Sequence, residues 1–175
     1  MIEYTNKTKC PLSILRPLFE QTAEAVGIDT TLPLRVKITQ GRTGSIKGFA
    51  LRRVEIWDEI RITLPSNPVL YNGKVRLFRS SPLDLAISLW RVIAHEWGHV
   101  LDYQALARGE KREFTYYRDL SSRRAIRHDD RPQEQRANSY AKDAEWQAYS
   151  GKVPCFKSAI AELVEWWEQT ARGRS

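Results

Sequence analysis

The chain has 175 residues, a length that suits one domain with its own hydrophobic core, so neither a disulfide nor a metal is needed merely for folding. A composition of 42% hydrophobic and 28% charged residues excludes collagen-like, low-complexity and wholly disordered proteins. Lys and Arg number 28 against 21 Asp and Glu, and the resulting net charge of +7 favours anionic partners without identifying one.

The sequence shows no sign of a membrane segment or of a disulfide framework. It has no apolar run of the roughly 18 residues that span a bilayer, and no apolar signal-peptide core follows Met1, so we expect a cytoplasmic protein with no membrane partner. The two cysteines, Cys10 and Cys155, lie far apart and outside any CxxC pair. We therefore expect two reduced thiols and no cysteine-based zinc site.

The first half of the chain predicts a helix followed by a small sheet. Apolar residues recur at helical spacing up to Gly27, and polar and apolar residues then alternate as they do in strands. The dipeptide Asn72-Gly73 is typical of a hairpin turn, because both residues tolerate positive φ. In chain order, the expected elements are a helix over 11–26, strands over 35–39, 48–57 and 59–64, and a hairpin of 69–71 with 74–78.

The second half predicts three helices and one long basic connection. Ser81-Pro82-Leu83-Asp84 is typical of a helix start, and Gly109 is the natural end of that helix. Residues 110–131 are rich in arginine and lack a period, whereas Pro132 begins a helix that runs to Tyr149 and Pro154 precedes a last helix. The prediction is one α+β domain over 1–175, with a helix and a small, mostly antiparallel sheet in 1–80. Residues 81–175 add an active-site helix, a basic loop, a ligand helix and a C-terminal helix.

The long helix contains His95-Glu96-Trp97-Gly98-His99, an HExxH arrangement. Four residues make about one helical turn, so both imidazoles project from one face and can bind one metal ion, with Glu96 close to the open coordination position. Zn²⁺ is the metal that prefers this donor set. The pattern therefore predicts a catalytic zinc site with His95 and His99 as two of its ligands.

A catalytic zinc site normally has a third protein ligand. Position 105, where one zincin subclass has a third histidine, is alanine. Asp102 is expected either to orient an imidazole N–H or to be a solvated helix-side acid. Glu134, one turn into the next helix, can point back at the two histidines, and we favour it over His128 because regular elements hold a site more precisely than a loop does.

The spacing of these residues resembles a known family. His95-Glu96-x-Gly98-His99 followed by Glu134-x-Arg136-Ala137-Asn138-x-Tyr140-Ala141 is similar to the ImmA/IrrE family of zinc metallopeptidases, over about residues 81–149. The resemblance implies a zincin-like, gluzincin-type fold, with His95, His99 and Glu134 as zinc ligands and Glu96 as the base. Members of this family are intracellular, and several cleave DNA-binding repressors. The segment from His99 to Asp102 and the loop after it also resemble the lethal-factor and proline-specific endopeptidase group, and SprT-like proteases are a third relation.

The expected activity is hydrolysis of peptide bonds in an intracellular protein, with a DNA-associated regulator as one candidate substrate. Glu96 is expected to take a proton from water and return it to the leaving amine. Tyr116, Tyr117 or His128 is the expected oxyanion donor, with no choice among them. An edge strand is expected to pair with an extended substrate, with 60–64 and 75–78 as the two candidates; the alternative for either segment is a central strand.

Two other classes of function fit the same sequence. The first is a nucleic-acid-binding protein whose Arg-rich segment 108–136 contacts phosphates. The second is an interaction protein that keeps a zincin fold without turnover, with Trp166-Trp167 either as a contact surface or as part of the core. A protease guided to its target by basic charge would combine proteolysis with proximity to nucleic acid.

Overall fold

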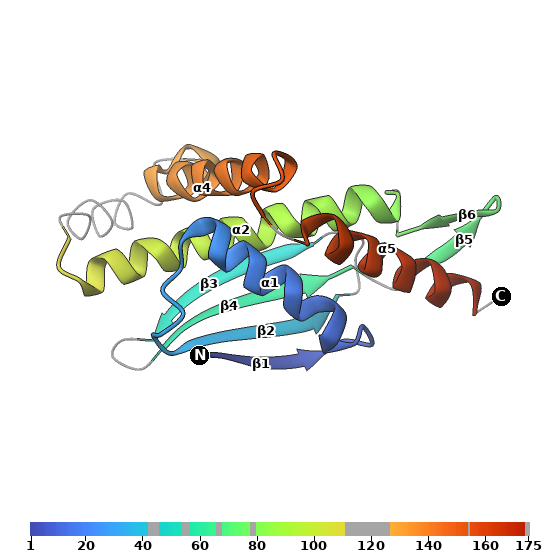
Figure 1. Cartoon of the computed structure of the whole chain (residues 1–175), viewed down its shortest axis with the longest axis horizontal. Coiled ribbons are helices and arrows are strands. Elements are labelled where there is room, and N and C mark those ends of the chain that lie inside the picture. The colour runs from blue at the N-terminus through green and yellow to red at the C-terminus, as the bar shows by residue number, and fades with distance from the viewer. Residues whose placement is uncertain are drawn as a thin grey trace.

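The structure is a computed structural model, and it describes residues 1–41, 46–53, 57–65, 68–77, 80–110, 127–153 and 155–173. Its α+β fold places the helices on one face of a four-stranded sheet (Figure 1). The elements are β1 (Ile2–Lys7), α1 (Leu12–Val26), β2 (Leu34–Gln40), β3 (Lys47–Arg53), β4 (Trp57–Leu64), β5 (Val69–Tyr71), β6 (Lys74–Arg76), α2 (Pro82–Ala107), η1 (His128–Asp130), α4 (Pro132–Tyr149) and α5 (Phe156–Arg172).

The sheet has the strand order β1-β2-β4-β3 and is mixed. Strands β1, β2 and β4 run parallel, and only β3 is antiparallel to its neighbour, so the prediction of a mostly antiparallel sheet was wrong. One reason is β1, a strand that the sequence analysis did not predict: helix α1 connects β1 to β2, and a helical crossover returns the chain in the same direction. The other reason is that β4 lies between β2 and β3, so β4 runs antiparallel to β3 and parallel to β2. The short β5–β6 hairpin turns at Asn72-Gly73, as predicted.

The position of each strand decides which edge is open. Strand β4 has β2 on one side and β3 on the other, so residues 60–64 form a central strand and not the candidate edge. Residues 75–76 belong to the separate hairpin, and Phe78 lies outside the described residues. Among the described strands, β3 has one sheet neighbour, and it contacts α2, so β3 is the edge beside the HExxH helix.

The predicted helix boundaries are confirmed where their capping residues are described. The Ser81 hydroxyl accepts a hydrogen bond from the backbone N–H of Asp84, which satisfies one of the free donors at the start of α2. Gly109 follows the end of this helix with a φ of 72°, a conformation that glycine adopts without a steric penalty. The predicted long helix is therefore observed, over Pro82–Ala107.

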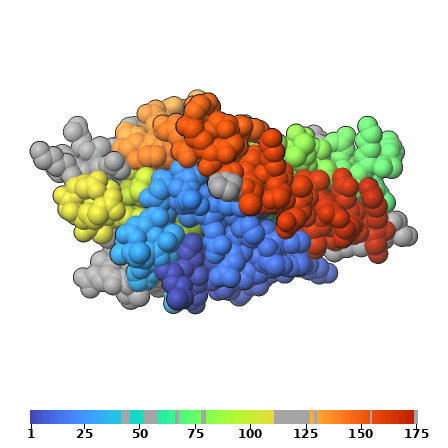
Figure 2. Space-filling model, in the orientation of Figure 1, coloured from blue at the N-terminus to red at the C-terminus, as the bar shows by residue number. Residues whose placement is uncertain are grey.

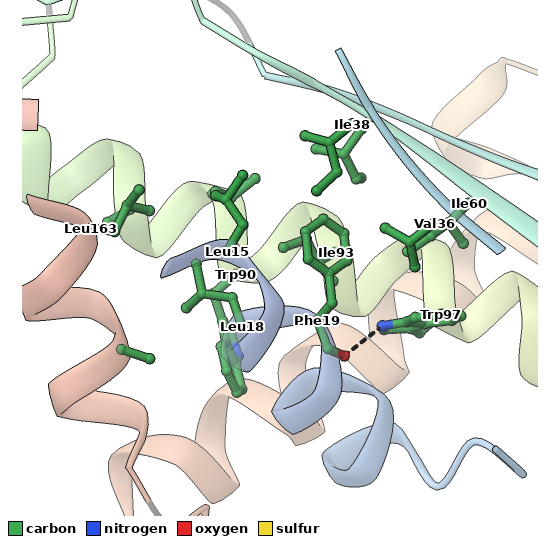
Figure 3. Packing of buried hydrophobic residues seen from close by; sticks show 14 of the residues in the cluster. Leu15, Leu18, Phe19, Val36, Ile38, Ile60, Trp90, Ile93, Trp97 and Leu163 are labelled. Atoms are coloured by element: carbon green, nitrogen blue, oxygen red, sulfur yellow. Dashed lines mark hydrogen bonds between the residues drawn. The ribbon is translucent and has the colours of Figure 1, made fainter. Parts of the chain in front are cut away.

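One hydrophobic core joins α1, the sheet, α2 and α5 (Figure 3). Trp97, from the middle of the HExxH sequence, is fully buried in this core and donates a hydrogen bond from Nε1 to the carbonyl oxygen of Phe19 at 3.1 Å. Since two residues correspond to about 200° around a helix, the anchoring of Trp97 turns His95 and His99 away from the core. Trp167 is also buried, so that half of the Trp166-Trp167 pair belongs to the core.

The C-terminal helices complete this arrangement. Helix α4 packs along α2 and also contacts α1, while α5 contacts both α1 and α2. Figure 2 shows α4 and α5, in orange and red, against the blue surface of α1. The packing of α4 along α2 brings residues some forty positions apart in the chain to one place. Among the described helices, none is both long and apolar enough to cross a membrane.

Candidate metal centre

Three potential ligand atoms from α2 and α4 form a nearly equilateral triangle. His95 Nε2 lies 3.2 Å from His99 Nε2 and 3.2 Å from Glu134 Oε2, and His99 Nε2 lies 3.3 Å from the same oxygen. In a tetrahedral zinc site with bonds of about 2.0 to 2.1 Å, two ligand atoms are separated by about 3.3 Å. The three side chains therefore fit three ligands of one zinc ion, and they form a group suited to a metal ion among the described residues.

The triangle depends on a close crossing of α2 and α4. A Cβ atom added at Gly98 would lie 3.0 Å from the Cα atom of Ala137 and 3.0 Å from the ring of Tyr140. The missing side chain at Gly98 lets the two backbones approach, and Ala137 adds only a methyl group on the other side. Because Gly98 precedes His99 and Ala137 lies one turn after Glu134, the close contact falls at the level of the ligands.

The Glu134 carboxylate contacts all three histidines of the chain. Its Oε2 atom accepts from His95 and His99, and its Oε1 atom lies 3.4 Å from His128 Nε2. Although burial raises its pKa, the hydrogen bonds from the two α2 histidines outweigh burial and hold the pKa of Glu134 well below the ordinary carboxyl value. Glu134, favoured in the sequence analysis, completes the triangle, whereas His128 lies outside it, with 64% of its side chain exposed.

Asn138 orients His95 and was not singled out from the sequence. Its side-chain oxygen lies 3.0 Å from His95 Nδ1, so with a metal bound Nδ1 would donate to Asn138 and Nε2 would offer its lone pair to the metal in place of its hydrogen bond to Glu134. Burial lowers the pKa of His95, but the hydrogen bond to Glu134 and the charge of Glu96 raise it more, and the net shift is upward. A sequence signal for Asn138 exists: it lies four residues after Glu134, on the same face of α4.

Glu96 lies between the HExxH helix and the edge strand and is 6% exposed. Gly48 on β3 leaves the space for its carboxylate, because a Cβ atom there would lie 2.3 Å from Glu96 Oε1. Burial raises the pKa of Glu96, against the lowering effects of the two histidines and of a hydrogen bond from the Ala50 backbone. A raised pKa suits a carboxylate that takes up a proton.

Asp102 joins the two ligand helices one turn beyond His99. It is 1% exposed, so the alternative of a solvated acid was wrong. Its Oδ2 atom accepts a hydrogen bond from Arg136 Nε at 2.9 Å, an ion pair between α2 and α4. The pair ties α4 to α2 beside the candidate ligands His95, His99 and Glu134. The candidate oxyanion donors Tyr116 and Tyr117 lie outside the described residues.

Two hollows flank the His95 and Glu96 side chains. One, of about 560 Å³, extends between α2 and α4 and ends near the ion pair of Arg91 Nε with Glu145 Oε2, which are 2.8 Å apart. The other, of about 330 Å³, lies toward Tyr103 and His128. Gly48 on β3 borders both hollows, together with His95 and Glu96 of α2.

When the chain was compared with protein-family models, curated proteins and solved structures, nothing matched.

Proposed function

We propose that this protein is a zinc-dependent endopeptidase, with His95, His99 and Glu134 as the metal ligands and Glu96 as the general base. One observation carries the proposal: three buried or half-buried donors lie at the mutual distances of zinc ligands, with a buried carboxylate of raised pKa next to two of them. Two histidines with one glutamate are an established catalytic zinc set. The proposal includes a zincin-like fold of the ImmA/IrrE type, on the resemblance described above.

In this mechanism the protein positions water, proton and peptide. Zinc, when bound, lowers the pKa of water to roughly 7 and polarises the substrate carbonyl. Glu96 takes the proton from the attacking water and delivers it to the leaving amine nitrogen, so one carboxylate acts as base and then as acid. The contact with Asn138 orients the His95 ring, and the absence of a side chain at Gly48 leaves the space that the Glu96 carboxylate occupies.

Strand β3 is the proposed binding edge for an extended peptide. It has one sheet neighbour, so its outward N–H and C=O groups can pair with a substrate backbone beside Glu96. The two hollows bordered by Gly48 would receive side chains on either side of the scissile bond. Tyr116, Tyr117 and His128 remain the proposed oxyanion donors.

The class of substrate is inferred from the family resemblance and from the net positive charge of the chain. We propose an intracellular protein, with a DNA-associated regulator as the candidate. The alternative is a zincin fold that binds a partner or nucleic acid without turnover. That alternative predicts no cleavage of any protein by zinc-loaded enzyme.

The zinc content of the purified, tag-free protein tests the site. We expect close to one zinc per chain in the wild type and in His128→Ala, and loss of zinc in His99→Ala and Glu134→Ala. His128→Ala is the matched control, because it removes an imidazole that contacts Glu134 without belonging to the triangle. Wild-type protein that neither contains zinc nor takes up added zinc would overturn the proposal.

A further inference from the structure

The face of the sheet opposite the helices carries an ordered set of polar side chains. Its positions follow from strand register: residues paired directly across strands share a face. Val36, Ile38 and Ile60 are buried on the helix side, so the residues that alternate with them point outward. Three outward rows cross all four strands in the order β1, β2, β4, β3. One consists of Glu3, Arg35, Glu59 and Leu51, and in it Arg35 forms an ion pair with Glu3. The other two are Thr5, Lys37, Arg61 and Phe49, then Lys7, Thr39, Thr63 and Lys47.

These two rows are positively charged. Arg61 forms an ion pair with Glu59 of the same strand, which neutralises it. Lys7, Lys37 and Lys47 form no ion pair with any residue in the described ranges. Since neighbouring strands lie about 4.8 Å apart, the row from Lys7 to Lys47 spans about 14 Å. No acidic residue belongs to either row.

The same rows offer hydroxyl groups and one aromatic ring. Thr39 and Thr63 lie side by side in the centre of the face, with their hydroxyl oxygens 3.2 Å apart. Phe49, at the edge of the row that contains Arg61, is 56% exposed although it belongs to a strand. An exposed ring next to unpaired lysines is the combination that binds an unpaired base and its phosphates.

We infer that this outer sheet face, defined by Lys7, Lys37, Lys47, Thr39, Thr63 and Phe49, binds single-stranded nucleic acid. Lysines and threonine hydroxyls would contact phosphates, and Phe49 would stack on a base. The exposed ring favours a single strand, because the bases of a duplex are already stacked on one another. This location differs from the arginine-rich segment 108–136 that the sequence suggested, and the inference does not depend on the proposed peptidase activity.

Fluorescence anisotropy with labelled oligothymidylate tests the inference on the full chain. We expect binding whose logarithmic affinity falls with the logarithm of salt concentration with a slope of about −2, since each of three neutralised phosphates contributes about −0.7. The variant Lys37→Glu/Lys47→Glu should bind at least about 10-fold more weakly and show a shallower slope. Phe49→Ala should bind about 5- to 10-fold more weakly with an unchanged slope.

The matched control is Lys74→Glu/Lys157→Glu, at two exposed lysines on β6 and α5. Each Lys→Glu change removes two charge units, so both double variants lower the formal net charge from +7 to +3. We expect the control to keep most of the affinity. Lys37→Gln/Lys47→Gln serves as the milder pair if the charge reversals unfold the protein, as judged by circular dichroism.

Three results would overturn the inference. The first is an equal loss of affinity in the control and in the sheet variant, which would mean diffuse attraction by net charge. The second is duplex DNA binding as tightly as the single strand with no effect of Phe49→Ala. The third is binding of polyglutamate but not of oligothymidylate, which would identify an acidic protein segment as the partner. None of these measurements requires zinc or peptide cleavage, so they stand apart from the peptidase proposal.

Discussion

The roles proposed for single residues follow from a few short contacts around the ligand triangle. The Glu96 side chain extends from α2 to Gly48 on β3. It lies close to the two histidines but outside the triangle that they form with Glu134. Asn138 contacts the far nitrogen of His95, at 3.0 Å. At this scale, metal binding and proton transfer belong to different side chains, so variants should separate them.

Replacement of Glu96 by glutamine should keep the zinc and remove most of the turnover. The amide is close to the carboxylate in shape but cannot accept the water proton, so we expect a loss of about 10²- to 10⁴-fold in cleavage of a denatured protein such as casein. Zinc content and cleavage rate are measured on the same preparation. Glu162→Gln, at an exposed position of α5, is the control. Full activity of the Glu96 variant would refute the assignment of the base.

Removal of the Asn138 side-chain oxygen should weaken metal binding. Asn138→Ala leaves His95 free to rotate and to change tautomer, and loss of such an outer contact typically costs about 10- to 100-fold in affinity. Competition with a chelator measures the zinc affinity. Asn138→Asp keeps an acceptor at the same place and should bind zinc far better than the alanine variant. Equal affinities for wild type and Asn138→Ala would show that the hydrogen bond has no such role.

At the scale of elements, the site exists because α2 and α4 cross closely. Gly98 and Ala137 form the contact point, and the buried Asp102 with Arg136 ties the helices one turn further along. The ligands come from both helices, so the distance between the helices sets the distance between Glu134 and the histidines. A change in the distance between α2 and α4 should therefore change both the affinity for zinc and the free energy of unfolding.

A larger side chain at Gly98 should lower both the affinity for zinc and the free energy of unfolding. The Cβ atom of Gly98→Val would be about 3.0 Å from Ala137 and Tyr140, so α4 must move, and crowding of this kind costs about 1 to 3 kcal/mol of unfolding free energy. Urea denaturation and chelator competition measure the two effects. Gly98→Ala should show a smaller loss of each, and Ser88→Val, on an exposed position of the same helix, should change neither by much. Unchanged zinc affinity in Gly98→Val would contradict the crossing argument.

In the whole molecule, one core connects the sheet, α1, α2 and α5. The two cysteines differ in their position relative to this core. Cys10 is 1% exposed and belongs to this core, whereas Cys155 is exposed. Burial raises the pKa of Cys10 to about 12, so it holds little of the reactive thiolate near neutral pH. The protein should therefore have one reactive and one protected thiol.

Thiol titration checks this expectation. Under native conditions we expect one equivalent to react quickly with a disulfide reagent and the second to react only in denaturant, as the core opens. Cys155→Ser should abolish the fast phase and leave the slow one unchanged. Two fast equivalents in the native wild type would mean that the core around Cys10 is open.

The features that depend on near neighbours in the chain were predictable before the fold was known. The HExxH spacing placed two imidazoles on one helical face, Ser81 and Gly109 marked the limits of that helix, and Asn72-Gly73 marked a hairpin. Glu134 could be favoured over His128 because it lies on a predicted helix. Each of these inferences needs only helical periodicity or local backbone preference.

The features that join distant segments appear only in the folded chain. The parallel pairs depend on β1 beside β2 and on β4 between β2 and β3, and Ile60 to Leu64 belong to a central strand because β3 pairs with the far side of β4. Helical spacing puts Asn138 on the same face of α4 as Glu134, but its contact with His95, like that of Gly48 with Glu96, depends on packing between elements. The outer sheet rows likewise exist only once four strands are in register. The physical reason is that local preferences act over a few residues, whereas strand order and helix crossing minimise the free energy of the whole core.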